Sequence, residues 1–108
     1  MSYNVDTTPN FEKEAKKLYK KYKSLKSEIL VLIDELSENP TKGIDLGNNI
    51  YKIRVAVKSK GKGKSGGMRV MTQVKIIKET VYLFSIYNKG DTDSISDNKI
   101  SELIQNIE

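Results

Sequence analysis

LGNNIYKIRVAVKSKGKGKSGGMRVMTQVKIIK, residues 46–78, predicts the central strands of the fold. Between positions 51 and 57 every odd residue is apolar or aromatic, which is the period-2 pattern of a strand with one face on a core. A second alternating run occupies residues 68–77. The residues between the two runs are mostly Gly, Lys and Ser and predict a flexible hairpin connection. We therefore expect two antiparallel strands here.

The residues before this stretch predict two helices. Thr8 followed by proline is typical of an N-cap and first helical position, and apolar residues then recur at helical spacing. A second helical pattern has Ser24 as its expected N-cap, includes Leu30 and Ile33 in its apolar face, and ends at the Asn-Pro pair 39–40. Two short-linked amphipathic helices predict an antiparallel helical hairpin.

The remaining segments complete the expected fold. Residues 3–7 alternate weakly and predict a short first strand, and residues 78–80 predict a turn. Residues 81–87 are apolar at nearly every position, which is typical of a central strand covered on both faces. A last helix is expected after a serine cap at Ser94 or Ser96. The expected fold is one α+β domain over residues 1–108, ordered β-α-α-β-β-β-α, with the helical hairpin packed on a small, mainly antiparallel sheet.

The positive charge is concentrated in the central stretch. Residues 46–78 contain nine Lys or Arg and no Asp or Glu, whereas residues 1–45 contain eight of each kind. Residues 79–108 contain two bases and six acids. A basic segment attracts a polyanion, because each neutralised phosphate releases a counterion. The sequence therefore points first to nucleic acid as a partner.

Composition also excludes several kinds of chemistry. The chain has no Cys and no His, so a disulfide framework, a thiol nucleophile and a paired-histidine ribonuclease are all excluded. Acidic clusters at residues 34–38 and 91–97 are better explained by helix starts and solvated surface than by a metal site, and we expect no cofactor. Lacking a signal-peptide pattern or a long apolar run, the sequence predicts a cytoplasmic protein without membrane contact.

Three strings, taken with the element order, resemble a known family. LGNNIYKIR at 46–54, KGKGKSGGMR at 60–69 and VYLFSIYNK at 81–89 are together similar to the RelE/ParE superfamily of bacterial type II toxins, and especially to its HigB-like RelE branch. The resemblance implies a ribosome-dependent, metal-independent mRNA endonuclease that inhibits translation. It also implies a cognate antitoxin that holds the toxin inactive, usually a helix-turn-helix DNA-binding protein in the HigB branch.

The resemblance also implies site residues. RelE toxins contact the scissile phosphate with basic residues on two strands, which correspond here to Lys52, Arg54 and Arg69. They use an Arg and a Tyr after the last strand, but positions near 90 and 96 carry neither residue in this chain. Tyr87 and Lys89 are the nearest substitutes. The expected catalytic set is therefore Lys52, Arg54, Arg69, Tyr87 and Lys89.

The residue types suit RNA cleavage without a metal. The guanidinium of Arg69 can hold two phosphoryl oxygens and stays charged, and fixed cations stabilise the charge that develops on the phosphate. A lysine crowded by cations has a lowered pKa, so Lys52 is the first candidate for acid or base and Lys89 the second. Tyr87 could stack on a base or donate a proton, or be an ordinary packed tyrosine. The ribosome would supply alignment that compensates for weak acid–base groups.

Further lysines are expected to contact RNA or the ribosome. They lie in the hairpin connection and on the first helix: Lys58, Lys60, Lys62, Lys64, Lys16, Lys17 and Lys20. The ordinary explanation for the helical lysines is a solvated helix face, and for the loop lysines a soluble hairpin tip. Without the resemblance, Lys52 and Arg54 would likewise be an exposed strand face.

Two other functions remain compatible with the sequence. A ParE-like inhibitor of DNA gyrase would share the fold, but it would not need cations converging on one strand face. A catalytically inactive RNA-binding protein of RelE fold would keep the basic face and lose the chemistry. The unmatched positions near 90 and 96 favour that reading.

Overall fold

The computed structural model describes residues 2–60, 67–91, 94–105 and 107, with the side chain of Lys60 excepted. Its elements follow one another as β1 (Asn4–Thr7), α1 (Pro9–Lys21), α2 (Leu25–Glu38), β2 (Ile44–Asp45), β3 (Ile50–Val55), the 3-10 turn η1 (Lys58–Lys60), β4 (Met68–Lys75), β5 (Thr80–Asn88) and α3 (Asp97–Ile104). The predicted order is confirmed, with β2 as an addition.

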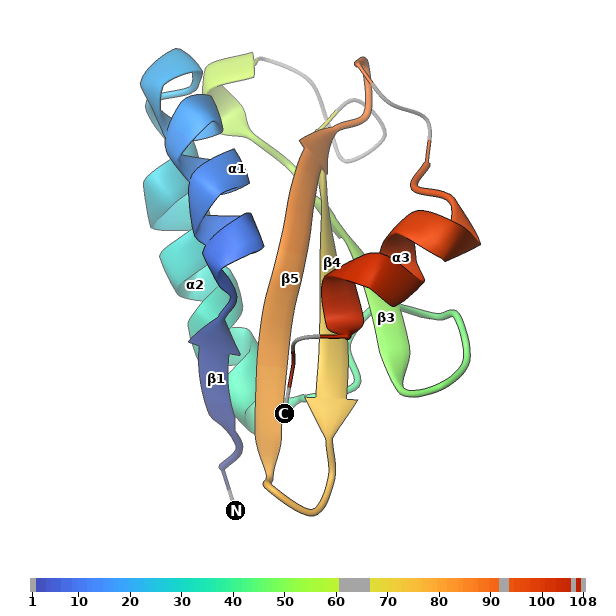
Figure 1. Ribbon diagram of the computed structural model, residues 1–108. Coiled ribbons are helices and arrows are strands. Elements are labelled where there is room, and N and C mark those ends of the chain that lie inside the picture. Colours follow the sequence, from blue (N-terminus) through green and yellow to red (C-terminus); the bar gives the residue numbers. More distant parts are fainter. Residues whose placement is uncertain (1, 61–66, 92–93, 106, 108) are drawn as a thin grey trace.

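The strands form one five-stranded sheet in the order β1-β5-β4-β3-β2. β1 runs parallel to β5, and the other neighbours are antiparallel, so the expected mainly antiparallel α+β fold is confirmed. The helical hairpin α1–α2 covers one face, and α3 lies across the other (Figure 1). In the described part of the chain, no helix is both long enough and apolar enough to cross a bilayer.

Alternation along the strands divides the apolar side chains between two clusters. Ile53, Val70 and Leu83 belong to the cluster beneath the helical hairpin, together with Phe11 and Leu36 of the helices. A smaller cluster lies beneath α3 and contains Ile50, Met71, Phe84, Tyr87, Ile100 and Ile107. β4 and β5 are therefore buried on both faces, as expected for β5.

Polar side chains of α1 hold that helix against β5. Oγ1 of Thr8 accepts a hydrogen bond from the backbone N–H of Phe11 at 3.2 Å and caps the helix, as predicted. The carboxylate of Glu14 accepts hydrogen bonds from Oγ of Ser85 at 2.8 Å and from the N–H of Ile86 at 3.2 Å. β1 pairs with β5 only as far as Leu83. Beyond that residue, Glu14 takes the place of a strand partner and accepts from the hydroxyl of Ser85 and the N–H of Ile86.

Two predicted details are wrong, and the predicted helix caps are confirmed with one difference. Leu30 is 57% exposed and does not join the apolar face of α2. The β4–β5 turn begins at Ile76, not at residue 78, and leaves Ile77 fully in solvent. Ser24 occupies the N-cap position of α2, as predicted, but its side chain makes no capping bond and donates to Glu28 and Ser59 instead. Of the two serines considered for α3, Ser96 provides the cap.

Gly67 is expected to be intolerant of any side chain. A Cβ atom at Gly67 would lie 2.1 Å from the carbonyl oxygen of Val55, whereas at Gly90 it would meet its nearest atom at 3.6 Å. We expect Gly67→Ala to lower the free energy of unfolding by about 1–3 kcal/mol, because β3 and β4 must separate where they meet. Denaturant unfolding measures the loss. Gly90→Ala is the matched control, and equal effects at the two glycines would contradict the prediction.

Candidate functional site

Three predicted site residues form one row across the sheet. Arg54 of β3 lies opposite Arg69 of β4, and Arg69 lies opposite Tyr87 of β5. The row is on the sheet face that carries α3, because Tyr87 packs in the cluster beneath that helix. Two like charges directly opposite each other on neighbouring strands are destabilising. A bound anion between them would relieve the repulsion.

Lys52 lies one alternation along β3 from Arg54, on the same face, as the sequence predicted. It is half-buried and borders a cavity of about 490 Å³ between the sheet and α3. Tyr87 and Met71 border the same cavity from the neighbouring strands. The cavity therefore brings the lysine and the tyrosine of the expected catalytic set to one space.

Tyr87 is only 8% exposed, and its hydroxyl has no hydrogen-bond partner among the residues that the structure describes. Burial raises the pKa of its phenol above the ordinary 10.0, and the nearby guanidinium of Arg69 opposes that rise without cancelling it. Tyr87 is therefore protonated at neutral pH. It can donate a hydrogen bond or a proton, but it cannot act as a base.

The two arginines differ in exposure. Arg69 is 3% exposed, and its Nη1 donates to the carbonyl of Met68 at 3.3 Å. Arg54 is exposed to solvent at the β3 side of the row. A ligand approaching the sheet from that side would therefore meet Arg54 before Arg69.

The remaining predicted residues lie apart from the cavity. Lys89 follows β5 with an exposed side chain, and its backbone N–H donates to the carbonyl of Gly67 at 3.3 Å. Lys58 is exposed at the start of η1. The backbone of Lys60 belongs to η1, and Lys62 and Lys64 lie outside the described residues.

The lysines of α1 are not near the row. Lys16, Lys17 and Lys20 are exposed on a helix that packs on the opposite sheet face from α3 (Figure 1). Lys16 borders a groove between α1 and α2 together with Lys13 and Lys26. These residues therefore form a second basic surface and do not extend the first.

Sequence reasoning missed the residues that α3 and the loops contribute. Asp97 and Ser101 of α3, Ser94 before it and Asn48 of the β2–β3 connection all border the cavity. The sequence explained Asp97 as a helix-start residue, and its position in the first turn of α3 agrees with that. Asp97 also borders the cavity that Lys52 borders, because α3 crosses the sheet there, and no local sequence pattern indicates that crossing.

The donor set of the described residues does not favour a metal. No group of three or more carboxylate residues close enough to hold an ion occurs within residues 2–60, 67–91 and 94–105. The row instead offers fixed cations, a protonated phenol and a neighbouring lysine. Such an arrangement can bind a phosphate and stabilise charge that develops on it.

Comparison with known proteins identifies relatives. The family model described as "RelE toxin of RelE / RelB toxin-antitoxin system" matches residues 5–106. The isolated E. coli RelE toxin has a similar structure, with a TM-score of 0.62, 21% identity, and 99% of this chain and 100% of that chain covered.

An E. coli RelE mutant with two arginines replaced by alanine is also similar. In the free state it gives a TM-score of 0.63 at 19% identity, with all of both chains covered. In complex with a peptide of the antitoxin RelB it gives 0.63 at 22% identity, again with all of both chains covered. At these identities the likeness shows a shared fold.

Proposed function

Because the chain belongs to the RelE toxin family, we propose that it is the toxin of a type II toxin–antitoxin system and cleaves mRNA on the ribosome. The observation that carries this proposal is the row of Arg54, Arg69 and Tyr87 beside the cavity that Lys52 borders. An anion site with a protonated phenol suits phosphoryl chemistry on RNA. We place the chain in the HigB-like branch on the strength of its three sequence strings.

Cleavage requires three events at the scissile phosphate. The 2′-hydroxyl loses a proton and its oxygen attacks phosphorus, negative charge accumulates on the phosphoryl oxygens, and the 5′-oxygen departs with a proton. Arg54 and Arg69 stabilise the accumulated charge, since a guanidinium can bind two oxygens at once. Tyr87 donates the proton to the leaving oxygen, because its raised pKa keeps it protonated.

Lys52 and Lys89 complete the proposed site. Lys52 borders the cavity beside Tyr87 and is the first candidate to accept the proton of the 2′-hydroxyl. Lys89 directly follows β5, the strand that carries Tyr87, and is the second candidate. A lysine accepts this proton only in its neutral form, so much of the barrier must be lowered by alignment of the RNA on the ribosome, since positioning alone can lower a barrier substantially.

The lysines outside the catalytic set are proposed to contact the ribosome and mRNA. The connection between β3 and β4, and so between Arg54 and Arg69 along the chain, contains Lys58, Lys60, Lys62 and Lys64. Lys16, Lys17 and Lys20 supply a second contact on the helical side. Contacts of this type add salt-dependent, sequence-independent affinity.

The proposed partner is a cognate antitoxin with a helix-turn-helix DNA-binding part, as expected for the HigB branch. An antitoxin is further supported by the likeness to an E. coli RelE mutant in complex with a RelB peptide. The site of action is the cytoplasm, where the proposed target is found.

A reconstituted translation reaction tests the proposal. We expect the purified toxin to cut a defined mRNA when ribosomes are present and to leave the same RNA intact when they are omitted. Primer extension maps the cuts. Uncut mRNA with normal translation would overturn the proposal, and a gyrase supercoiling assay would then test the ParE-like alternative.

A further inference from the structure

The cavity between the sheet and α3 has an apolar floor and a polar mouth. Ile50 and Met71 border it from the strands and are buried. Asn48, Asp97 and Ser101 border it too, but these three residues are exposed. A volume of about 490 Å³ is within the range of small-molecule sites, which combine apolar walls with a few polar groups that fix orientation. Such a space suits a flat ring with a polar edge.

The polar groups around this cavity are available to a ligand. In the described part of the chain, the side chains of Asn48, Asp97 and Ser101 make no hydrogen bond or ion pair. The hydroxyl of Tyr87 is buried at the cavity and also has no partner among the described residues. A buried hydroxyl without a partner costs free energy, so a ligand that supplies one would be favoured.

The turn before β3 holds Asn48 at the mouth of the cavity. Gly47, Asn48 and Asn49 have φ angles of 89°, 54° and 63°, in the left-handed region that Gly and Asn tolerate best. The N–H of Gly47 donates to Oδ1 of Asp45 at 2.7 Å, and the N–H of Ile50 donates to the carbonyl of Gly47 at 3.0 Å. These bonds fix the turn, so Asn48 is a positioned group.

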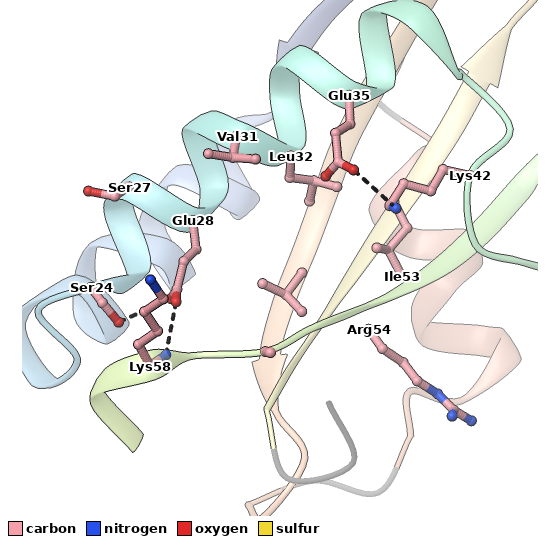
Figure 2. Close-up of a pocket in the computed structure, with 12 residues that line it drawn as sticks. Ser24, Ser27, Glu28, Val31, Leu32, Glu35, Lys42, Ile53, Arg54 and Lys58 are labelled. Atoms are coloured by element: carbon pink, nitrogen blue, oxygen red, sulfur yellow. Dashed lines mark hydrogen bonds and ion pairs between the residues drawn. The ribbon is translucent and has the colours of Figure 1, made fainter. Parts of the chain in front are cut away.

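The groove between α2 and β3 offers a contrast, because its acids are already bonded (Figure 2). Oε2 of Glu28 accepts from the backbone N–H of Lys58 at 2.8 Å, and Glu35 pairs with Lys42 at 3.4 Å. Figure 2 also shows Arg54 extending away from these bonded groups. A ligand held by Arg54 is therefore better served by the cavity beneath α3 than by this groove.

We propose that the cavity beneath α3 holds the base of a nucleotide that flanks the scissile phosphate, and that Asp97 makes it selective for bases with an exocyclic amino group. This inference rests on the proposed function for the identity of the substrate. An ionised carboxylate only accepts hydrogen bonds. Adenine, cytosine and guanine each present an amino group, whereas uracil presents carbonyl oxygens in its place. Uracil is therefore the disfavoured base.

Lys52 connects the cavity to the row of Arg54, Arg69 and Tyr87. It borders the cavity and lies on the same face as Arg54, two residues or about 6.8 Å away along β3. A phosphate bound at the row would leave a neighbouring base within reach of the cavity. The negative charge of Asp97 disfavours a phosphate in the cavity itself, so a base is the better occupant.

Asp97→Asn tests the selectivity. Asparagine has nearly the same shape, but its amide can also donate a hydrogen bond to a uracil carbonyl. On programmed ribosomes, wild type should cut codons with an amino-bearing base beside the cut about tenfold or more faster than matched codons with uracil there. In Asp97→Asn this ratio should fall to about threefold or less. Single-turnover cleavage of a codon series measures both ratios, and thermal melting checks that the variant is folded.

Glu102→Gln is the matched control. Glu102 is exposed on the same helix, but it borders a separate cavity with Lys78 and Tyr82. Its substitution should keep the wild-type ratio. A general effect of the lost charge at Asp97 would change all codons alike and leave the ratio constant. Equal ratios in wild type and Asp97→Asn, or no discrimination against uracil in wild type, would overturn the proposal.

Binding of uncleavable RNA separates this inference from the function it rests on. Trinucleotides with 2′-O-methyl groups lack the attacking hydroxyl and cannot be cut. The adenine trimer should shift the methyl resonances of Met71 and Ile100 at a concentration about tenfold lower than the uracil trimer does, and Asp97→Asn should narrow that difference. If mRNA stays intact while this preference is seen, the endonuclease proposal fails and the base site stands. If mRNA is cut but neither trimer shifts these resonances, the base site is overturned.

Discussion

Arg69→Ala is expected to reduce ribosome-dependent mRNA cleavage by about a hundredfold or more, the usual cost of removing a fixed group that stabilises transition-state charge. Arg69 is central to the row, with Arg54 on one side and Tyr87 on the other. Arg69→Lys keeps the charge but loses the two-pronged guanidinium, so its activity should fall between wild type and alanine. Single-turnover cleavage on programmed ribosomes measures the three rates.

A lysine on the same strand provides the control. Lys75 ends β4, away from the row, and Lys75→Ala should change cleavage by about twofold or less, because it removes one weakly interacting cation. Since Arg69 is buried, thermal melting must show that Arg69→Ala remains folded. A folded Arg69→Ala toxin that cuts as fast as wild type would remove Arg69 from the site.

Tyr87→Phe is expected to lower cleavage by roughly a hundredfold without destabilising the fold, because a lost general acid typically costs that much or more. Phenylalanine keeps the ring in the cluster beneath α3 and removes only the hydroxyl. That hydroxyl is buried without a partner among the described residues, so the free energy of unfolding should stay constant or rise by about 1 kcal/mol. Cleavage assays and denaturant unfolding measure the two effects.

Tyr82→Phe is the matched control. Tyr82 belongs to the same strand and packs against the same cluster, but it does not border the cavity with Lys52. Its substitution should leave cleavage unchanged. If Tyr87→Phe also cuts at the wild-type rate, Tyr87 is a packed tyrosine and the proton comes from another group, such as Lys89.

The raised pKa of Tyr87 also predicts that the stability of Tyr87→Phe depends less on pH than the stability of wild type. Burial raises the pKa in the folded state above the ordinary 10.0, so above pH 10 the unfolded chain loses the phenolic proton more readily than the folded one. Stability therefore falls as pH rises above that value. Tyr87→Phe should reduce the fall but not remove it, because burial and the nearby Glu12 also raise the pKa of Tyr19. Thermal melts on both sides of pH 10 show the difference.

The sequence predicts those parts of the fold that depend on local patterns. Thr8, Pro9 and the helical spacing after them indicate α1 correctly, and the alternation around Lys52 and Arg54 places both on one face. β2 escaped prediction because two residues are too few to show a period. Its position depends on Gly43, where a Cβ atom would lie 2.7 Å from the carbonyl oxygen of Lys52.

The row itself could not be predicted. The connection between β3 and β4 has no pattern that sets the register, so the pairing of Arg54 with Arg69 was undetermined. A register shift at Met71 and Thr72 further alters the alignment of β4 with β5, and so of Arg69 with Tyr87. The burial of Arg69 depends on the same long-range packing, whereas its residue type suggested only a polar strand face.

The parallel pairing of β1 with β5 has a consequence for synthesis of the protein. Asn4 of β1 pairs with Thr80 of β5, so the first strand to be synthesised cannot pair until the last strand has been made. Contacts so distant in sequence form late, and a nascent chain lacking β5 also lacks Tyr87 and one neighbour of β4. An unfinished toxin therefore cannot assemble the row while its C-terminal part is still being translated. If the chain acts on ribosomes as proposed, the ribosome that makes it would meet a complete site only when synthesis is nearly finished.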